Sequence, residues 1–339
     1  MVAMKRIALL PLIMVCTMCS AGSDWQGVID DDKNLNRPTI PADKEDTSEG
    51  KDPAGEQTPA DQSVRIGVFT DAHYSATKAN TTERFYQASG KKIADAVETF
   101  ANEKVDLVVS LGDLVDNEYE DYEDIGQSLE KLTMPVYKVL GNHDFINPYS
   151  EQQQSAALKV LGITDRYFSV VKGGTRLIFL DSSDIATYSH PLESAGYRNA
   201  ESILKTLKDD LAENARKYNG AISQTQMSWL ESELKEATAA SQNVFCFLHI
   251  PLAVSGAAKY TLWNGEDVID VLSAYPCAKA VIAGHHHAGG YSSAGGLHHI
   301  TLKGMVQGED TSYSILEISE DSIRIDGYGR EDDIEYKFR

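Results

Sequence analysis

Five short apolar runs in this chain each end at a polar residue that is able to bind a metal ion. These ends are Asp71, Asp113, Asn142, His249 and the stretch 285–287. Short runs rich in valine and isoleucine are typical of buried strands, and ligands of α/β folds bind beyond the carboxyl ends of such strands. The pattern therefore predicts that two aspartates, an asparagine and several histidines gather at one edge of a sheet. This is more than the four ligands that a single ion commonly takes.

The charge of the chain argues against a nucleic-acid polymer as substrate. The net charge is −20, and 42% hydrophobic residues over 339 positions are enough for a globular core. Binding of DNA or RNA depends on Lys and Arg side chains that neutralise phosphates, so an acidic body disfavours it. A small phosphorylated substrate remains compatible with this charge if bound cations supply positive charge locally.

Residues 1–22 have the form of an export signal. A short basic segment precedes the apolar stretch 7–15, which is too short to span a bilayer. Cys16 and Cys19 follow it, which indicates a bacterial lipoprotein signal with Cys19 as the favoured anchor, although neither cysteine has the usual small residue before it. A cleaved secretory peptide, processed near Ala21, is the alternative. We therefore expect an exported protein, in the periplasm or at the cell surface of a bacterium.

The composition changes at residue 63. Residues 23–62 are rich in Asp, Glu, Lys, Pro, Gly, Ser and Thr, and they contain too few large apolar residues to offset their ordering entropy. They predict a disordered acidic tether. In residues 63–339 strands alternate with amphipathic helices, among them 91–102 and a helix that opens with a capping box at Ser223 and Gln226. We expect one domain of the α/β (α+β) class, a four-layer αββα sandwich of two mixed β-sheets flanked by helices.

Two further cysteines, Cys246 and Cys277, do not form a disulfide framework by number alone. Cys246 lies inside an apolar strand, where a buried free thiol is the usual state. A bridge between the two in an exported protein is left open by the sequence.

Taken in order, the five polar blocks resemble the calcineurin-like metallophosphoesterase superfamily over about residues 64–330. The blocks are Asp-x-His, Gly-Asp, Gly-Asn-His-Asp, His and Gly-His-x-His, each after a strand. The resemblance implies two divalent ions that share Asp113 as a bridging ligand. The other implied ligands are Asp71, His73 and His287 for the first ion, and Asn142, His249 and His285 for the second. Carboxylate, imidazole and amide ligands suit Mn, Fe, Zn or Co, and we expect manganese.

The same resemblance implies a catalytic role for His143. Its imidazole would contact the phosphate and stabilise the transition state or protonate the leaving oxygen. Asp144 would orient this ring, and a helix cap is the structural alternative for Asp144. Asp116 stands where the iron-containing purple acid phosphatases have a tyrosine, so an iron(III)–tyrosinate is not expected.

A narrower resemblance concerns the substrate. Tyr74, the stretch 220–230, Trp263-Asn264 and the stretch 284–299 are similar to the manganese-dependent ADP-ribose/CDP-alcohol diphosphatases, which hydrolyse the pyrophosphate link of such nucleotides. The chain departs from that subfamily at two positions, which often hold glutamine and an acidic residue where His73 and His286 stand here. The departures put the substrate in doubt and leave the metal site unaffected. The resulting substrate-binding candidates are Tyr74, Trp263, Asn264 and His286.

Two of these candidates have a structural alternative. Trp263 would stack on a nucleobase or choline, but a core tryptophan is as consistent with the sequence. His286 lies between two predicted ligands and is interpreted as a rim or substrate contact, with a merely solvated side chain as the alternative.

We expect a metal-dependent hydrolase that cleaves phosphodiester or pyrophosphate bonds of small nucleotide-linked substrates, by attack of a metal-bridging hydroxide on phosphorus. A broad-specificity exported phosphomonoesterase is the first alternative. A non-catalytic surface lipoprotein is the second, and the complete set of ligand residues argues against it. The segment 184–220 inserts between core elements, so we expect it to carry specificity. The oligomeric state is left open.

Overall fold

The structure is a computed structural model that describes residues 63–145 and 149–338. The predicted export signal, its candidate anchors Cys16 and Cys19, and the predicted tether lie outside these residues. Within the described ranges, no helix is long and apolar enough to cross a membrane.

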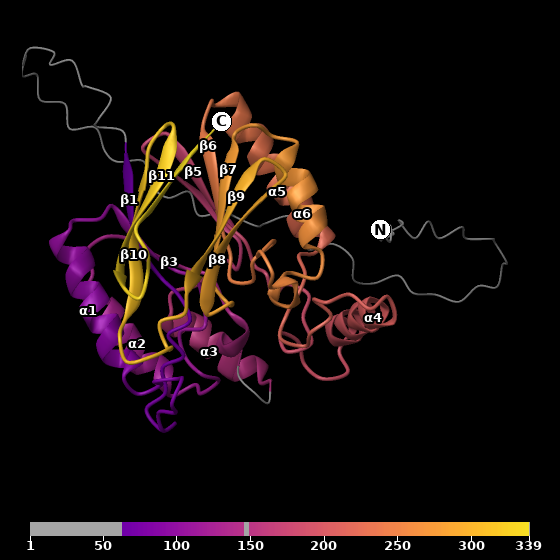
Figure 1. Cartoon of the computed structure of the whole chain (residues 1–339). Helices are drawn as coiled ribbons and strands as arrows, with labels where there is room; N and C mark the ends of the chain where they lie inside the picture. Colours follow the sequence, from indigo (N-terminus) through magenta and orange to yellow (C-terminus); the bar gives the residue numbers. More distant parts are fainter. Residues whose placement is uncertain (1–62, 146–148, 339) are drawn as a thin grey trace, which may run out of the picture. The chain divides into compact units, whose positions relative to one another are not determined.

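Two six-stranded sheets of mixed direction form the centre of the domain (Figure 1). The first consists of β1 (Val64–Phe69), β2 (Leu107–Ser110), β3 (Val136–Lys138), β10 (Ser312–Ile318), β11 (Ser322–Gly329) and β12 (Ile334–Lys337). The second consists of β4 (Phe168–Lys172), β5 (Thr175–Phe179), β6 (Asn243–Phe247), β7 (Ala278–Ala283), β8 (Ala288–Ala294) and β9 (Leu297–Lys303). Their strand orders are β12-β11-β10-β1-β2-β3 and β4-β5-β6-β7-β9-β8. The parallel strands β1, β2 and β3, and likewise β5, β6, β7 and β9, run side by side.

The two sheets pack on each other through a continuous apolar core. Alternate residues of β1, Val64, Ile66 and Val68, belong to this core together with Phe179 and Phe247 of the second sheet. The rings of Phe179 and Phe247 stack with centroids 5.3 Å apart. Full burial of a side chain of this kind stabilises the fold by about 1.5–3 kcal/mol, so this core holds the two sheets together.

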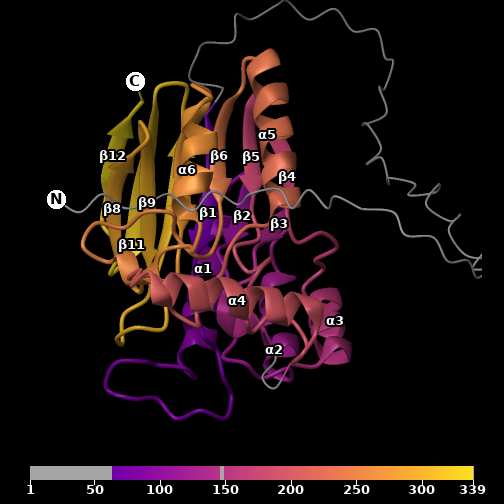
Figure 2. The ribbon, with the colours of Figure 1, turned by 90° about the vertical axis from the view of Figure 1, so that its right-hand side faces the viewer.

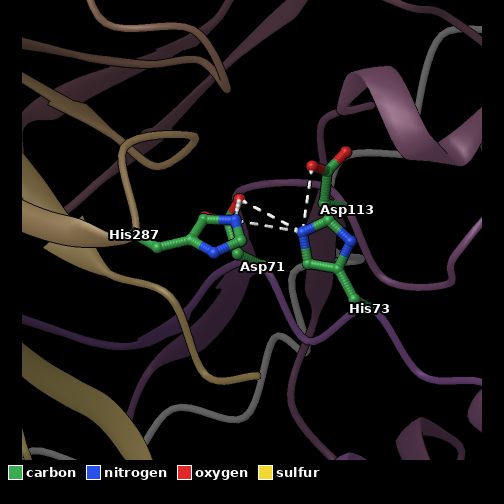
Figure 3. A group of neighbouring side chains, drawn as sticks. All are labelled: Asp71, His73, Asp113 and His287. Atoms are coloured by element: carbon green, nitrogen blue, oxygen red, sulfur yellow. Dashed lines mark hydrogen bonds and ion pairs between the residues drawn. The ribbon is translucent and has the colours of Figure 1, made fainter. Parts of the chain in front are cut away.

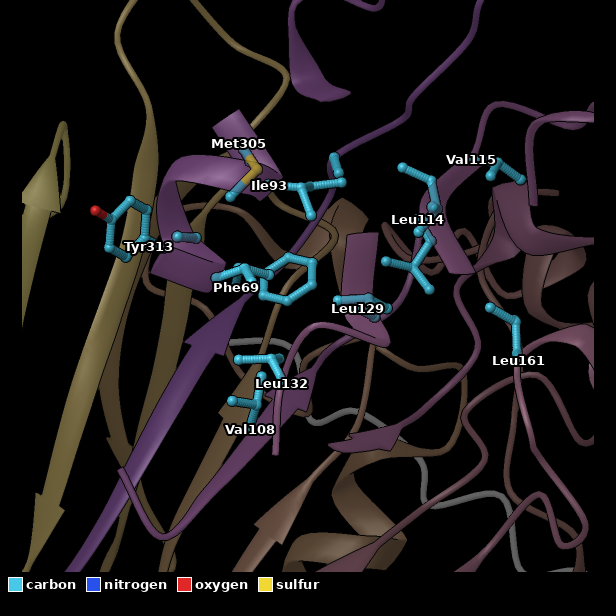
Figure 4. Close-up of a cluster of buried hydrophobic side chains, with 14 of the residues drawn as sticks. Phe69, Ile93, Val108, Leu114, Val115, Leu129, Leu132, Leu161, Met305 and Tyr313 are labelled. Atoms are coloured by element: carbon cyan, nitrogen blue, oxygen red, sulfur yellow. The ribbon is translucent and has the colours of Figure 1, made fainter. Parts of the chain in front are cut away.

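Helices cover the outer face of each sheet. The helices α1 (Ser89–Asn102), α2 (Asp121–Leu129) and α3 (Glu151–Val160) pack on the first sheet, and α5 (Gln224–Ala239) and α6 (Gly265–Ser273) on the second. Figure 4 shows the first of these outer cores, where Ile93 of α1 and Leu129 of α2 surround Phe69 of β1. The expected four-layer sandwich is confirmed.

The inserted segment between β5 and β6 contributes α4 (Ala195–Asp209), which lies across the ends of α5 and α6 in Figure 2. Its apolar face packs on Trp263 and Ala221 in a small core of its own. The predicted cap of α5 is present, because the Ser223 hydroxyl accepts a hydrogen bond from the Gln226 amide at 3.2 Å. Cys246 is a buried free thiol, as predicted, and Cys277 is also free.

Candidate metal centre

Four of the predicted ligands, from three separate parts of the chain, meet in one cluster, shown in Figure 3. Asp71 follows β1, Asp113 follows β2 and His287 follows β7. The Nε2 atom of His73 lies 3.3 Å from Oδ2 of Asp113, and Nε2 of His287 lies 3.2 Å from Oδ1 of Asp71. One potential ligand atom from each residue lies within 4.8 Å of every other, which is close enough for a single ion.

A second cluster shares Asp113 with the first. The Nε2 atom of His249 lies 3.3 Å from Oδ2 of Asp113 and 3.3 Å from Oδ1 of Asn142. The Nδ1 atom of His285 lies 3.2 Å from Nε2 of His249. One carboxylate oxygen of Asp113 is therefore equidistant from His73 and His249, which is the position that a ligand shared by two ions must occupy. All seven predicted ligand side chains come together here.

Hydrogen bonds at the far side of two imidazoles fix which nitrogen faces the centre. His249 donates from Nδ1 to the carbonyl of Leu111 at 2.8 Å, which leaves the lone pair on Nε2. His285 donates from Nε2 to the side-chain oxygen of Asn219 at 3.0 Å, which leaves the lone pair on Nδ1. If both rings were neutral, their lone pairs would point at each other across 3.2 Å, so a proton or a metal ion between them stabilises this arrangement. Outer partners of this kind are typical of metal-binding histidines.

The first cluster has the same character. The Nε2 atoms of His73 and His287 lie only 3.1 Å apart, and Nδ1 of His73 faces Asp116 at 3.3 Å. Oδ1 of Asp71 is buried and forms no hydrogen bond, although His287 Nε2 lies 3.2 Å away. The donor set of carboxylate, imidazole and amide oxygen fits two borderline divalent ions such as Mn, Fe, Zn or Co.

The electrostatics of the centre also require cations. Burial opposes charge on His73 and His249, but the nearby carboxylates, Asp113 foremost among them, together outweigh burial and raise the pKa of both imidazoles to about 9. Burial likewise acts to raise the pKa of Asp71, yet the neighbouring His287 and His73 hold that pKa well below its usual value. Burial, and then His249, lower the pKa of His285 to about 3. The carboxylates are thus negative, and protons and metal ions compete to neutralise them.

Backbone strain is concentrated at the same residues. Asp71, His73, Asp113 and His285 all have positive φ, between 44° and 67°. Non-glycine residues in this region cost of order 1–3 kcal/mol each and are typical of functional sites. The glycines of the motifs serve close approach, since a Cβ at Gly141 would lie 2.1 Å from Oδ1 of Asp113.

The ring of His143 lies next to the centre and is about one-third exposed. Its backbone amide donates to Oδ1 of Asp113 at 2.7 Å, and its ring meets that of His73 edge-on at 4.5 Å. Its Nδ1 lies 2.6 Å from Oδ1 of Asp116, a carboxylate that also pairs with Lys78. Burial acts to raise the pKa of Asp116, but contacts with His143, His73 and Lys78 hold it far below the usual value.

The expectation that Asp144 orients His143 is corrected by these contacts. The buried Asp144 carboxylate accepts hydrogen bonds from the backbone amides of Asp113 at 2.7 Å, Leu114 at 2.8 Å and Gly141 at 2.9 Å. It therefore fastens the turn after β3 to the loop after β2, close to the capping role that was the structural alternative. The carboxylate that faces His143 belongs to Asp116.

Three of the four substrate-binding candidates have their polar groups occupied within the fold. Trp263 is buried and donates from Nε1 to the carbonyl of Arg216 at 3.1 Å. Asn264 pairs in both directions with the backbone of Ile222, at 3.0 and 2.9 Å. Tyr74 packs on the first outer core and donates its hydroxyl to Asp124 at 3.0 Å. The expectations for Trp263 and Asn264 are corrected, because these side chains form packing and loop-joining contacts. The expected substrate contact of Tyr74, whose hydroxyl bond is at the surface, stays a prediction.

His286 is half-buried beside the centre and stacks on Tyr260, and its expected role as a rim or substrate contact stays a prediction. Sequence reasoning missed the residues behind the histidines. Asn219 accepts from His285, and the side-chain amide of Gln307 lies 2.9 Å from Nδ1 of His287. Neither follows an apolar run, so no strand pattern marked them. The position of Asp116, three residues after Asp113, indicated that it lies near the metal centre. The sequence did not indicate that it faces His143.

The part of the chain that matches a known protein family contains the strands and loops that form this centre. The family model of the calcineurin-like phosphoesterases matches residues 64–289, which contain all seven candidate ligands. The chain belongs to the calcineurin-like phosphoesterase family. It is therefore a metal-dependent hydrolase with a two-metal centre.

Relatives with curated descriptions extend the match over most of the chain. The manganese-dependent ADP-ribose/CDP-alcohol diphosphatase of Danio rerio is 28% identical over 311 residues, which span 79% of this chain and 96% of that protein. The Arabidopsis thaliana protein of the same description is 27% identical over 278 residues, with 74% and 88% coverage. The crystal structure of a dimetal phosphatase from Danio rerio has the same fold, with a TM-score of 0.70 at 24% identity over 81% of this chain and 99% of that one.

Proposed function

We propose that this phosphoesterase hydrolyses the pyrophosphate bond of small nucleotide-linked substrates of the ADP-ribose or CDP-alcohol type, with manganese as its metal. The observation that carries the proposal is the shared position of Asp113 between two ligand clusters, in a chain similar over about three-quarters of its length to enzymes of that description. ADP-ribose and water would give AMP and ribose 5-phosphate. CDP-choline and water would give CMP and phosphocholine.

The seven candidate ligands would hold the two ions, and His143 would act on the substrate. When bound, the two ions would neutralise the phosphoryl oxygens and provide a nucleophile at neutral pH. His143 supports a proton-transfer role because Nδ1 faces Asp116, so Nε2 is the ring atom left for the substrate. A histidine held in this orientation can protonate the leaving phosphate oxygen without a large movement of its side chain.

Lys78 helps to fix the carboxylate of Asp116 that faces His143. Its ammonium contacts both the carboxylate and, at 3.0 Å, the backbone carbonyl of Asp116. The Asp116 carboxylate is thus held in place by a group that is not itself in the centre. A fixed carboxylate keeps the His143 ring in one orientation.

The test is a substrate panel with the manganese-loaded full-length protein. ADP-ribose and CDP-choline are compared with a phosphodiester and with several phosphomonoesters, and the products are identified by chromatography. We expect AMP and CMP as the nucleotide products, with kcat/KM for the diphosphates above that for every monoester. Asp113→Asn is the control, and it should lose activity on all substrates. Higher activity on monoesters than on either diphosphate would replace the proposal by the phosphomonoesterase alternative.

A further inference from the structure

Three half-buried rings form a group beside the second ligand cluster. Tyr260 stacks on His286 with centroids 4.6 Å apart and planes inclined by 26°. Tyr218 lies 5.9 Å from Tyr260 at 30°. Both tyrosines also contact the ring of His285, at 5.5 and 6.0 Å. We call Tyr218, Tyr260 and His286 the aromatic wall. It lies directly beside His285, a predicted metal ligand.

The wall is held in place by one buried side chain. Asn219 donates from its amide to the carbonyls of Asn214 at 3.0 Å and Lys259 at 2.9 Å, which joins the loop of Tyr218 to the loop of Tyr260. Its oxygen accepts from Nε2 of His285 at 3.0 Å. The same amide therefore positions both tyrosines relative to the metal centre, so the wall is preorganised for whatever part of the substrate extends from the ions.

Basic residues flank the wall in a chain whose net charge is −20. Arg216 and Lys217 directly precede Tyr218, and Lys259 directly precedes Tyr260. The ammonium of Lys259 lies over the Tyr260 ring, 4.9 Å from its centroid. These cations favour an anionic ligand, and they disfavour a quaternary ammonium group such as choline, which would be repelled at the same place.

We propose that the aromatic wall is a stacking site for the base of a nucleotide whose phosphate lies at the metal centre. The proposal rests on the proposed function for its choice of nucleotide substrates. Planar bases stack on aromatic side chains without hydrogen-bond readout, so the wall accepts a purine or a pyrimidine. Lys259 is exposed, and a base that stacks on this face of Tyr260 would displace its ammonium toward the phosphates. The buried Trp263 cannot take this role.

The test compares AMP with ribose 5-phosphate, which is the same sugar phosphate without the base. Dissociation constants are measured by calorimetry with the manganese-loaded full-length protein, or replaced by KM values if these monoesters are themselves hydrolysed. We expect AMP to bind at least about fivefold more tightly than ribose 5-phosphate, since stacking on one aromatic ring contributes roughly 5- to 150-fold. Tyr260→Leu should remove most of this difference, and Tyr260→Phe should keep it.

Further variants separate stacking from folding. Tyr218→Leu removes the ring on the loop that precedes Asn219. It should also weaken AMP binding severalfold and leave the affinity for ribose 5-phosphate unchanged. Tyr197→Leu, on α4 and hydrogen-bonded to Glu201, is the matched control and should change neither constant. Equal affinity of the native protein for the two probes would overturn the proposal, and so would an equal loss of both in Tyr260→Leu.

The two proposals fail in different experiments. Absence of turnover with ADP-ribose and CDP-choline would remove the proposed function, whereas the comparison of AMP with ribose 5-phosphate tests the wall by itself. A protein that turns over neither diphosphate but still prefers AMP would keep the base site and change the bond that is cleaved.

Discussion

The Nδ1 atom of His143 lies 2.6 Å from Oδ1 of Asp116, and the same oxygen lies 3.3 Å from Nδ1 of His73. One carboxylate thus contacts both the histidine assigned to proton transfer and a candidate ligand of the first ion. Asp116 is 4% exposed, so its contacts are little screened by water. The orientation of the two rings is therefore coupled through a residue that binds neither substrate nor, in the predicted scheme, metal.

Substitution Asp116→Asn should lower kcat by roughly 10- to 100-fold, as is typical for partners behind metal-site histidines. The amide keeps the shape of the carboxylate but removes the negative charge that faces the His143 ring. We also expect weaker binding of one metal ion, because His73 loses the same partner. Steady-state kinetics together with metal analysis by mass spectrometry provide the measurement. Asp95→Asn, on α1 with a side chain that is 47% exposed, is the control. Unchanged kcat would remove Asp116 from the scheme.

Substitution His143→Asn should reduce turnover by about 100- to 10,000-fold, the range for loss of a general acid. Metal content and melting temperature should hold, since no contact of the His143 ring is needed to cage an ion in the predicted ligand set. The two variants are separated by metal analysis, in which only Asp116→Asn loses affinity. Loss of an ion from His143→Asn would show that the division between ligand and acid is wrong.

Manganese affinity should rise with pH up to about 9. Burial acts to lower the pKa of His73 and His249, but the nearby carboxylates, Asp113 foremost, together raise it to about 9 when no ion is bound. Below that pH each imidazole carries a proton that a metal ion must displace, so affinity falls as pH falls, by as much as roughly 100-fold per unit if both protons are released. Calorimetry at several pH values, in buffers of different ionisation enthalpy, counts the protons. A pH-independent affinity between pH 6.5 and 8.5 would contradict the prediction.

Lys92 should make the fold more stable at alkaline pH. It is 4% exposed and donates to the carbonyls of Met305 at 2.9 Å and Gly308 at 2.7 Å. Burial, followed by the charge of Arg330, lowers its pKa to about 8, below the roughly 10.4 of an unfolded chain. Between these values the unfolded chain binds more protons, so the free energy of unfolding rises with pH.

The expected gain from this group between pH 8 and 10 is about 2 kcal/mol. Denaturant unfolding at both pH values gives the free energy of unfolding. Its increase from pH 8 to pH 10 should be about 2 kcal/mol smaller in Lys92→Met than in the native protein. Lys91→Met is the control, because the side chain of Lys91 is 79% exposed. An equal increase in all three proteins would show that Lys92 is not perturbed.

The N-terminal prediction is tested separately, since it lies outside the described residues. If Cys19 is the lipid anchor, Cys19→Ser should abolish incorporation of labelled palmitate in a bacterial host, and Cys16→Ser should not. The reverse pattern would move the anchor to Cys16. A native protein that is exported without label would indicate the cleaved secretory peptide instead.

The sequence by itself determined the layers and the convergence of the ligands. Short runs such as those before Asp71 and Asp113 form parallel strands, and parallel strands end at the same edge of a sheet. The meeting of Asp71 and Asp113 follows from strand direction, which a one-dimensional pattern of apolar residues encodes. His249 follows β6 of the second sheet and joins them because the two sheets pack on each other.

Only the tertiary structure decided which neighbour each of these side chains has. Asp116 rather than Asp144 faces His143, and the carboxylate of Asp144 is occupied by three backbone amides instead. Asn219 reaches His285 across 66 positions, and Tyr260 reaches His286 from a different loop. Such contacts depend on how loops pack after the strands have formed. Loops carry no periodic pattern from which their packing can be read.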